Sequence, residues 1–471
     1  MPSRLQFART ILLTATLLAT PAIATAQALT PAEATAIDTL VTTTLAKTGP
    51  PSASIAVVRG GRIILAKAYG KQSETASSAR ADAPYQIASV SKQFTAAALQ
   101  LLEDDGKLSL DDTVAKYLPG ITRGETIKLR QLLSHTAGLQ DYWPQDYSFK
   151  AMGTPVEPQG IVDRWAKKPL DFAPGTQWQY SNTGYVVAGM IVEKVAGEPL
   201  LAFLQRRIFA PLGMTAVDQD IAIGGRYPTG YGRAALGPMR PVVPAAHGWL
   251  FAAGELAMSA TDLAKWNIAR MNRAVLPSDD WAAQETPVKL TDGTSTGYGL
   301  GVSIGHVGDR RVVSHTGEAV GFLTQNIVYP ADKVAIVVLT NTWSSDAYRA
   351  IASGIAKTVL PVQPATAADT RALAGARALL DQLIAGRPDR TRLTDNAAYY
   401  FTPATIADYR TSLAPLGRPT DFVQTGASTL RGGFVGRGYR VSFGNRAIAI
   451  STFTEPGING RIEQFLISPA D

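Results

Sequence analysis

The 471-residue sequence contains no cysteine and only four histidines, His135, His247, His306 and His315. Without cysteine the chain has no disulfide, no thiolate metal ligand and no cysteine nucleophile. Four scattered histidines also argue against a histidine-rich metal site. Charged residues are sparse, at 18%, whereas 46% of the residues are hydrophobic, which is enough to bury a core. The composition predicts a globular, disulfide-free protein without a histidine-rich metal site.

The basic residues form no run of the kind that binds nucleic acid. The formal net charge of +7 comes from 45 basic and 38 acidic residues, and the basic residues are scattered along the chain. A mildly basic surface favours solubility and attraction to anionic polymers. We therefore expect no nucleic-acid partner.

Only the amino-terminal apolar run approaches the length of a membrane span. Arg4 and Arg9 precede an apolar segment, residues 11–19. Ala24-Thr25-Ala26 then supplies the small residues of a cleavage site. The pattern predicts a signal peptide over residues 1–26 and a periplasmic or secreted protein with no stable membrane span after cleavage. A retained membrane anchor is the alternative, because no charge interrupts the run.

The mature chain divides into two units at a proline-containing segment. Residues 27–362 form the larger unit, residues 363–368 a linker, and residues 369–471 an accessory α+β unit. In the larger unit, a glycine-turn hairpin near the start and a strand meander over 312–339 predict an antiparallel sheet closed by both ends of the unit. Helical patterns between them, one of which is expected to begin at Ser259, predict a helical region beside the sheet, and so an α+β fold.

The first motif with catalytic potential is Ser89-Val90-Ser91-Lys92, at the start of a helical pattern that runs from about Ser91 to Asp105. Residues three positions apart lie on one face of a helix, so the Lys92 amine can reach the Ser89 hydroxyl. Backbone N–H groups at a helix start can also stabilise an oxyanion. Alone, the motif is equally compatible with a capped helix and a solvated lysine.

Two further motifs follow in the chain. Tyr180-Ser181-Asn182 offers a phenol for proton transfer and an amide for a substrate carbonyl, although a buried tyrosine and a capping asparagine would look the same. His315-Thr316-Gly317 follows a strand pattern, and its glycine would let a substrate backbone approach closely. An ordinary strand end is the alternative for this third motif.

In this order and at this separation, the three motifs resemble the serine penicillin-recognising enzymes, a superfamily of DD-peptidases, class C-type β-lactamases and related esterases. Segments 132–139 and 297–301 add to the resemblance, which covers about residues 30–360. It implies a β-lactamase/transpeptidase-like fold, with an antiparallel sheet flanked by helices and a mostly helical subdomain. The accessory unit resembles a cystatin-like α+β domain.

The resemblance implies roles for eight residues, which are Ser89, Lys92, Tyr180, Asn182, His315, Thr316, Gly317 and Glu318. Ser89 would be the nucleophile, with Lys92 and Tyr180 sharing the proton transfers. A phenolate at Tyr180 would need cationic neighbours, namely Lys92 and His315 if protonated. Asn182 would bind a substrate carbonyl and Thr316 would contact the substrate. The backbone N–H groups of Ser89 and Glu318 would form the oxyanion hole, and no metal or organic cofactor would be required.

His315 stands where many β-lactamases of the superfamily carry lysine. An imidazole offers a substrate carboxylate a less certain charge than an ammonium does. The resemblance therefore favours a DD-peptidase-like or esterase-like serine hydrolase that acts through an acyl-enzyme on a D-alanyl peptide or an ester. A class C-type β-lactamase and an envelope penicillin-binding sensor that does not turn over are the alternatives.

Two other catalytic interpretations are less favoured. Gly301-Val302-Ser303-Ile304-Gly305 matches the G-x-S-x-G nucleophile elbow, but turn residues follow it where the elbow requires a helix. His135 is expected to hold a loop through hydrogen bonds, not to complete a Ser-His-Asp triad.

Overall fold

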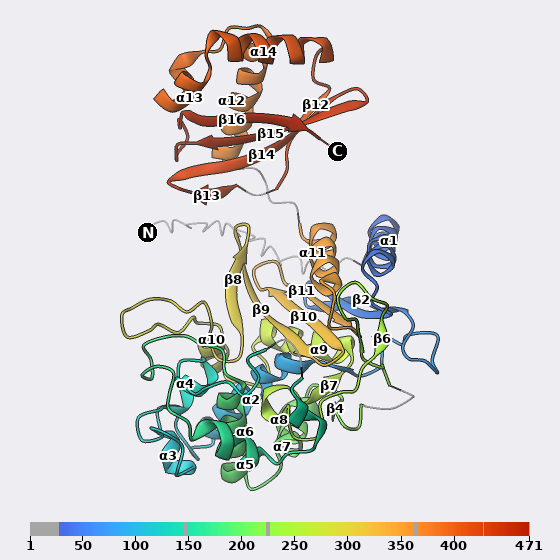
Figure 1. The fold of residues 1–471 in the computed structure, drawn as a ribbon, viewed down its shortest axis with the longest axis vertical. Coiled ribbons are helices and arrows are strands. Elements are labelled where there is room, and N and C mark those ends of the chain that lie inside the picture. The colour runs from blue at the N-terminus through green and yellow to red at the C-terminus, as the bar shows by residue number, and fades with distance from the viewer. Residues whose placement is uncertain (1–27, 146–147, 223–226, 362–365, 427, 471) are drawn as a thin grey trace, which may run out of the picture.

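The computed structural model describes residues 28–145, 148–222, 227–361, 366–426 and 428–470 (Figure 1). The predicted signal peptide, residues 1–26, lies outside this part of the chain. Among the helices of the described ranges, none combines the length and the apolar character needed to cross a membrane.

The larger unit is built on a six-stranded antiparallel sheet with the order β2-β1-β11-β10-β9-β8. Its strands are β1 (Ser52–Arg59), β2 (Arg62–Gly70), β8 (Ser303–Val307), β9 (Arg310–Ala319), β10 (Phe322–Tyr329) and β11 (Val334–Thr340). Gly60 and Gly61 form the predicted hairpin turn, and both have positive φ, 57° and 74°, as tight hairpins favour. Ile55 of β1 lies opposite Val338 of β11. The predicted sheet, closed by both ends of the unit, is therefore confirmed.

Two helices from opposite ends of the unit cover one face of this sheet, α1 (Pro31–Thr48) and α11 (Ala347–Val359) (Figure 1). A capping box starts α1, because Thr30 Oγ1 accepts from Glu33 N–H while the Glu33 carboxylate accepts from Thr30 N–H. Strand β11 is buried along its whole length: Ile336 and Val338 belong to the core under α1 and α11, whereas Val337 and Leu339 belong to the core on the other face. A central strand covered on both faces explains the unbroken apolar run.

The helical region packs on that other face. Its helices are α2 (Lys92–Asp104), α3 (Val114–Tyr117), α4 (Leu129–Leu133), α5 (Pro158–Ile161), α6 (Asn182–Ala196), α7 (Leu200–Leu204), α8 (Phe251–Gly254), α9 (Ala260–Asn272) and α10 (Ser278–Gln284). Short strands accompany them: β3 (Tyr85–Gln86), β4 (Ala216–Asp218) and β7 (Leu256–Met258) form one sheet, and β5 (Tyr231–Gly232) pairs with β6 (Arg240–Pro241). Helix α9 begins where the sequence predicts, because Ser259 Oγ accepts from Asp262 N–H. The α+β fold class is confirmed.

The carboxyl-terminal residues form a second antiparallel sheet with helices. The elements are α12 (Ala367–Ile384), α13 (Asp395–Tyr400), α14 (Pro403–Leu413), β12 (Asp421–Gln424), β13 (Thr429–Arg431), β14 (Phe434–Phe443), β15 (Arg446–Thr454) and β16 (Ile462–Pro469). Its hydrophobic core draws on residues 373–467 alone. The cystatin-like assignment of this unit stays a prediction.

The predicted linker is too long at its carboxyl-terminal end. Helix α12 starts at Ala367, where Thr366 Oγ1 accepts from Asp369 N–H, so residues 366–368 belong to the helix and its cap. The threonine N-cap ends the linker earlier than composition suggests. Residues 362–365, the rest of this segment, lie outside the described ranges.

A chain truncated after Val362 is expected to fold and to keep hydrolytic activity. The reason is that the two units have separate hydrophobic cores and that every recognised motif precedes Pro361. Thermal unfolding of the truncated and full-length proteins, together with ester hydrolysis, would check this. A truncated protein without a cooperative transition would show that the larger unit depends on the accessory unit.

Candidate active site

Ser89 lies on a 3₁₀ turn, Ala88–Ser91, that leads directly into α2. The turn is sharp because Ala88 has a φ of 49°, a left-handed conformation that is uncommon outside glycine. Behind it, Leu256 of β7 donates its N–H to Ser91 Oγ at 3.2 Å. Ser89 therefore precedes the α-helix, which begins at Lys92, and this partly buried serine lines a pocket.

Lys92 Nζ lies 3.0 Å from Ser89 Oγ, 2.8 Å from Asn182 Oδ1 and 2.7 Å from the Ala253 carbonyl. The two carbonyl oxygens can only accept, so they take N–H bonds from the lysine. In the neutral amine the remaining lone pair then faces Ser89 Oγ. The geometry lets Lys92 take the hydroxyl proton and so activate the serine.

The Lys92 side chain is 0% exposed. Burial lowers the pKa of this lysine to about 7, and the nearby Asp141 carboxylate opposes the shift. The Tyr180 and Tyr185 rings lie 4.9 and 5.3 Å from Nζ, where they stabilise its protonated form. An amine with a pKa near neutrality can both accept and return a proton during one catalytic cycle.

Tyr180 lies on the loop before α6, and its side chain hydrogen-bonds Ser89. Burial raises the pKa of the phenol above its ordinary value near 10, although the bond to Ser89 opposes the shift. Tyr180 is therefore a neutral phenol in the free protein, in contrast to the phenolate base considered from the sequence. A neutral phenol beside the nucleophile can still pass a proton onward.

Asn182, the first residue of α6, joins Lys92 to a carboxylate that the sequence analysis did not identify. Its Oδ1 accepts from Lys92, while its backbone N–H and Nδ2 donate to the Asp141 carboxylate at 3.0 and 3.2 Å. Trp143 N–H also donates to Asp141. Burial raises the pKa of Asp141. No sequence motif contains Asp141, so only the folded chain shows that it belongs to the site.

Strand β9 approaches the Ser89 turn so closely that only glycine fits at position 317. A Cβ on Gly317 would lie 2.1 Å from the Ile87 carbonyl oxygen. The next residue, Glu318, lines the same pocket as Ser89. The structure thus brings together the two backbone positions to which the sequence analysis assigns an oxyanion hole, and that assignment remains a prediction.

His315 is buried in β9, and both of its ring nitrogens have partners within the protein. The Thr316 carbonyl accepts from Nδ1 at 2.6 Å, so Nε2 accepts from the Tyr298 hydroxyl at 2.8 Å. Burial, together with the charge of Lys92, lowers the pKa of His315 to about 4. The imidazole is neutral and points at Tyr298, which differs from the expected cation beside Tyr180. Neither His315 nor Thr316 lines the pocket.

The pocket holds about 740 Å³ of space, including its open mouth. Its lining residues are Ser89, Asp141, Trp143, Gln145, Tyr180, Asn182, Leu250, Ala253, Gly254, Glu318 and Trp343. Two of these residues are acidic and none is basic. Sequence reasoning missed the two tryptophans, Gln145 and Leu250 because apolar and amide residues in loops carry no distinctive spacing.

Ser303 does not lie in a nucleophile elbow. It starts β8, pairs with Ser314 of β9, and is followed by the β8–β9 hairpin turn. An elbow requires a helix directly after the serine, so the structure lacks the local geometry that the less favoured Ser303 interpretation needs.

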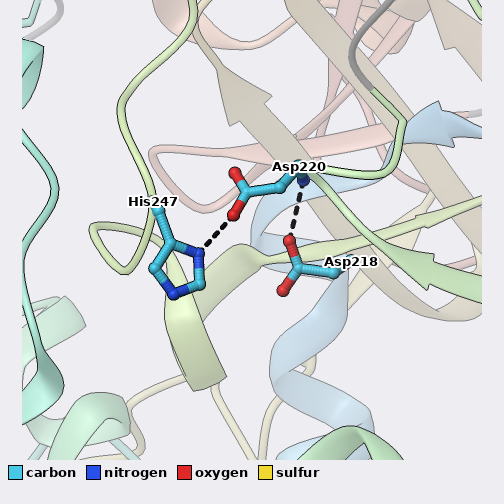
Figure 2. A group of neighbouring side chains, drawn as sticks. All are labelled: Asp218, Asp220 and His247. Carbon is cyan, nitrogen blue, oxygen red and sulfur yellow. Dashed lines mark hydrogen bonds and ion pairs between the residues drawn. The ribbon is translucent and has the colours of Figure 1, made fainter.

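One group of side chains among the described residues has the composition of a metal site, namely Asp218, Asp220 and His247 (Figure 2). Asp220 N–H donates to Asp218 Oδ1 at 2.7 Å, and His247 Nδ1 contacts the Asp220 carboxylate. Asp218 also faces Glu255, whose pKa is raised to about 8 by burial and by Asp218. His247 is exposed, and none of the three residues lines the Ser89 pocket.

Ser89 lies beside the buried amine of Lys92, three residues further along the chain, and Tyr180 and strand β9 with Gly317 lie next to the same serine. This arrangement defines a serine hydrolase of the S-x-x-K class. The family model described as Beta-lactamase matches residues 37–359. The chain therefore belongs to the beta-lactamase family.

Individual relatives agree with this assignment. Penicillin-binding protein 4* of Bacillus subtilis (strain 168) is 28% identical over 341 residues, covering 66% of this chain and 72% of the relative. A D-aminopeptidase of Brucella canis is 28% identical over 298 residues, covering 62% of this chain but only 56% of the relative. A D-stereospecific amidohydrolase from Streptomyces sp. has a similar structure, with a TM-score of 0.59, 27% identity and coverage of 68% and 98%.

Proposed function

We propose that the chain is an acyl hydrolase that forms an ester on Ser89 and acts on D-alanyl amides, peptides and activated esters. One observation carries the proposal: Lys92 Nζ lies 3.0 Å from Ser89 Oγ, while carbonyl oxygens occupy its other hydrogen-bonding directions. A serine hydroxyl is a weak nucleophile until a neighbouring base takes its proton, and this arrangement supplies that base.

The proposed reaction has two halves. Ser89 Oγ attacks the substrate carbonyl carbon as its proton passes to Lys92, and the carbonyl oxygen becomes an oxyanion bound by the Ser89 and Glu318 N–H groups. The carbon–leaving-group bond then breaks, and the proton reaches the leaving group through the Tyr180 hydroxyl. Water attacks the acyl-enzyme in the second half, with Lys92 and Tyr180 acting in reverse, and the acid product leaves.

The charge of the pocket supports substrates with a free amino group. Asp141 and Glu318 are the two acidic lining residues, and no lining residue among those described carries a guanidinium or an ammonium group. A substrate ammonium would be attracted to Asp141, whereas a substrate carboxylate would lack a cationic partner at the pocket wall. This favours D-aminoacyl amides and esters over β-lactams, because the neutral His315 does not replace a binding cation.

A matched pair of substrates tests this preference. D-alanine p-nitroanilide should be hydrolysed with a higher kcat/KM than its N-acetyl derivative, and Asp141→Asn should lower that ratio by about 10- to 100-fold, the effect of a charged hydrogen bond. The ratio cancels any catalytic loss that both substrates share. A chromogenic cephalosporin and an acylated D-Ala-D-Ala peptide belong in the same assay. Efficient cephalosporin turnover with neither alanine substrate hydrolysed would favour the β-lactamase alternative.

The proposal also includes export to the periplasm or medium. It is supported by the charged, apolar and small-residue segments of residues 1–26. The protein recovered outside the cytoplasm of its bacterial host should begin at Gln27 on amino-terminal sequencing. A membrane-bound protein that retains residues 1–26 would show that the segment serves as an anchor.

A further inference from the structure

His135 lies directly behind Tyr180 and is 2% exposed. Its ring centroid is 4.2 Å from that of Tyr180, with an interplanar angle of 34°. The rings of Trp178, Tyr185 and Tyr298 surround the imidazole at 6.0, 5.2 and 4.8 Å. Because His135 does not line the pocket, it cannot touch a substrate there.

Hydrogen bonds from His135 hold the backbone on both sides of Tyr180. The His135 carbonyl accepts from Gln179 N–H at 3.0 Å, and its Nδ1 accepts from Ser181 N–H at 3.1 Å. His135 reaches both groups with a φ of 60°, a left-handed conformation that is uncommon for this residue type. One residue thus binds the backbone N–H groups of both neighbours of Tyr180.

The bond to Ser181 requires an unprotonated Nδ1, so the neutral imidazole carries its proton on Nε2. Burial lowers the pKa of His135 well below its ordinary value, and the charge of Lys92 acts in the same direction. Within the described residues, Nε2 has no hydrogen-bond partner. A proton relay needs partners at both nitrogens, so His135 does not act as one.

We propose that His135 is a positioning residue that fixes the Tyr180 hydroxyl where it can protonate the leaving group. The inference rests on the proposed function, because it assigns that proton transfer to Tyr180. A tilted ring contact and two backbone bonds beside Tyr180 restrain the phenol, and a displacement of about 1 Å at a catalytic group can cost about 100-fold in rate. Substrates whose leaving group needs no proton depend little on this restraint.

The test compares a poor leaving group with a good one. D-alaninamide must have its leaving nitrogen protonated, whereas D-alanine p-nitrophenyl ester releases a stable phenolate. His135→Phe keeps an aromatic ring but removes the acceptor for Ser181 N–H, so kcat/KM should fall about 30-fold for the amide and less than about 3-fold for the ester. His135→Asn keeps an oxygen acceptor and tolerates the left-handed backbone, so it should lose less on the amide.

The double variant with Tyr180→Phe decides whether His135 acts through Tyr180. If it does, His135→Phe will have no further effect on the amide-to-ester ratio once the phenol is absent. His306→Asn, at an exposed histidine of β8, is the matched control and should change neither substrate. Thermal unfolding of each variant identifies a protein that has lost its fold, in which case His135→Asn supplies the comparison.

Two results would overturn the inference. An equal loss on the amide and the ester, or a full additional loss in the Tyr180→Phe background, would mean that His135 only supports the fold. A different result would count against the proposed function itself: if Tyr180→Phe alone left amide hydrolysis unchanged, the proton path through the phenol would be wrong.

Discussion

Replacement of Ser89 by alanine is expected to abolish covalent labelling by penicillins or organophosphonates and to lower ester hydrolysis by at least about 10⁴-fold. Ser89 is the hydroxyl that lies 3.0 Å from the buried amine of Lys92, so its removal leaves no activated nucleophile at the pocket. Mass spectrometry of the labelled wild-type protein would locate the adduct.

Ser303→Ala is the matched control for this experiment. Ser303 carries the competing G-x-S-x-G pattern but lies at the start of β8, paired with Ser314. Labelling and hydrolysis should stay close to the wild-type level in this variant. An adduct found on Ser303, or activity lost in Ser303→Ala and kept in Ser89→Ala, would contradict the site assignment.

Lys92→Met is expected to lower kcat/KM by about 10³- to 10⁴-fold while the protein remains folded. Methionine fills a similar buried volume without the amine. The packing around Ser89 is therefore kept, whereas the base that takes the hydroxyl proton is lost. Retention of the wild-type unfolding temperature, or a higher one, would separate loss of the base from loss of the fold.

The pH dependence gives a second measure of the same group. Lys92 acts as a base only when it is neutral, and its pKa is about 7, so the kcat/KM of the wild type should rise as the pH increases through about 7 and then level off. His315, with a pKa lowered to about 4, titrates too low to cause that rise. The residual kcat/KM of Lys92→Met should not show this rise near pH 7, which is the ascending limb of the pH profile. An unchanged limb in the variant would assign the titration to another group.

Features set by neighbouring residues could be predicted from the sequence. The Gly60-Gly61 turn, the Ser259 cap of α9 and the three-residue spacing of Ser89 and Lys92 depend on contacts within one turn of chain. Local sequence carries enough information for such features, because the residues that decide them are adjacent.

Features set by distant residues could not be predicted from the sequence. Asp141, in a loop, joins the site because Asn182 of α6 donates to it, and His315 turns to Tyr298 because the loop before β8 places that hydroxyl there. The sequence predicted a charged or substrate-facing imidazole at 315, since a motif gives no information about burial. The 3₁₀ turn at Ser89 was also missed, because hydrophobic periodicity is insensitive to the positive φ of Ala88.

The pairing of β1 with β11 has a consequence for how the protein assembles. Ser52 N–H donates to Asn341 Oδ1 at 2.8 Å, a contact between residues 289 positions apart. The ribosome makes β1 early, yet its central partner exists only after Thr340 has been added, so the main sheet cannot close during most of synthesis. Contacts this far apart in sequence make folding slow and leave sheet edges unpaired meanwhile. The early hairpin of β1 and β2 is therefore expected to keep the β1 edge unpaired until the last third of the chain has been made.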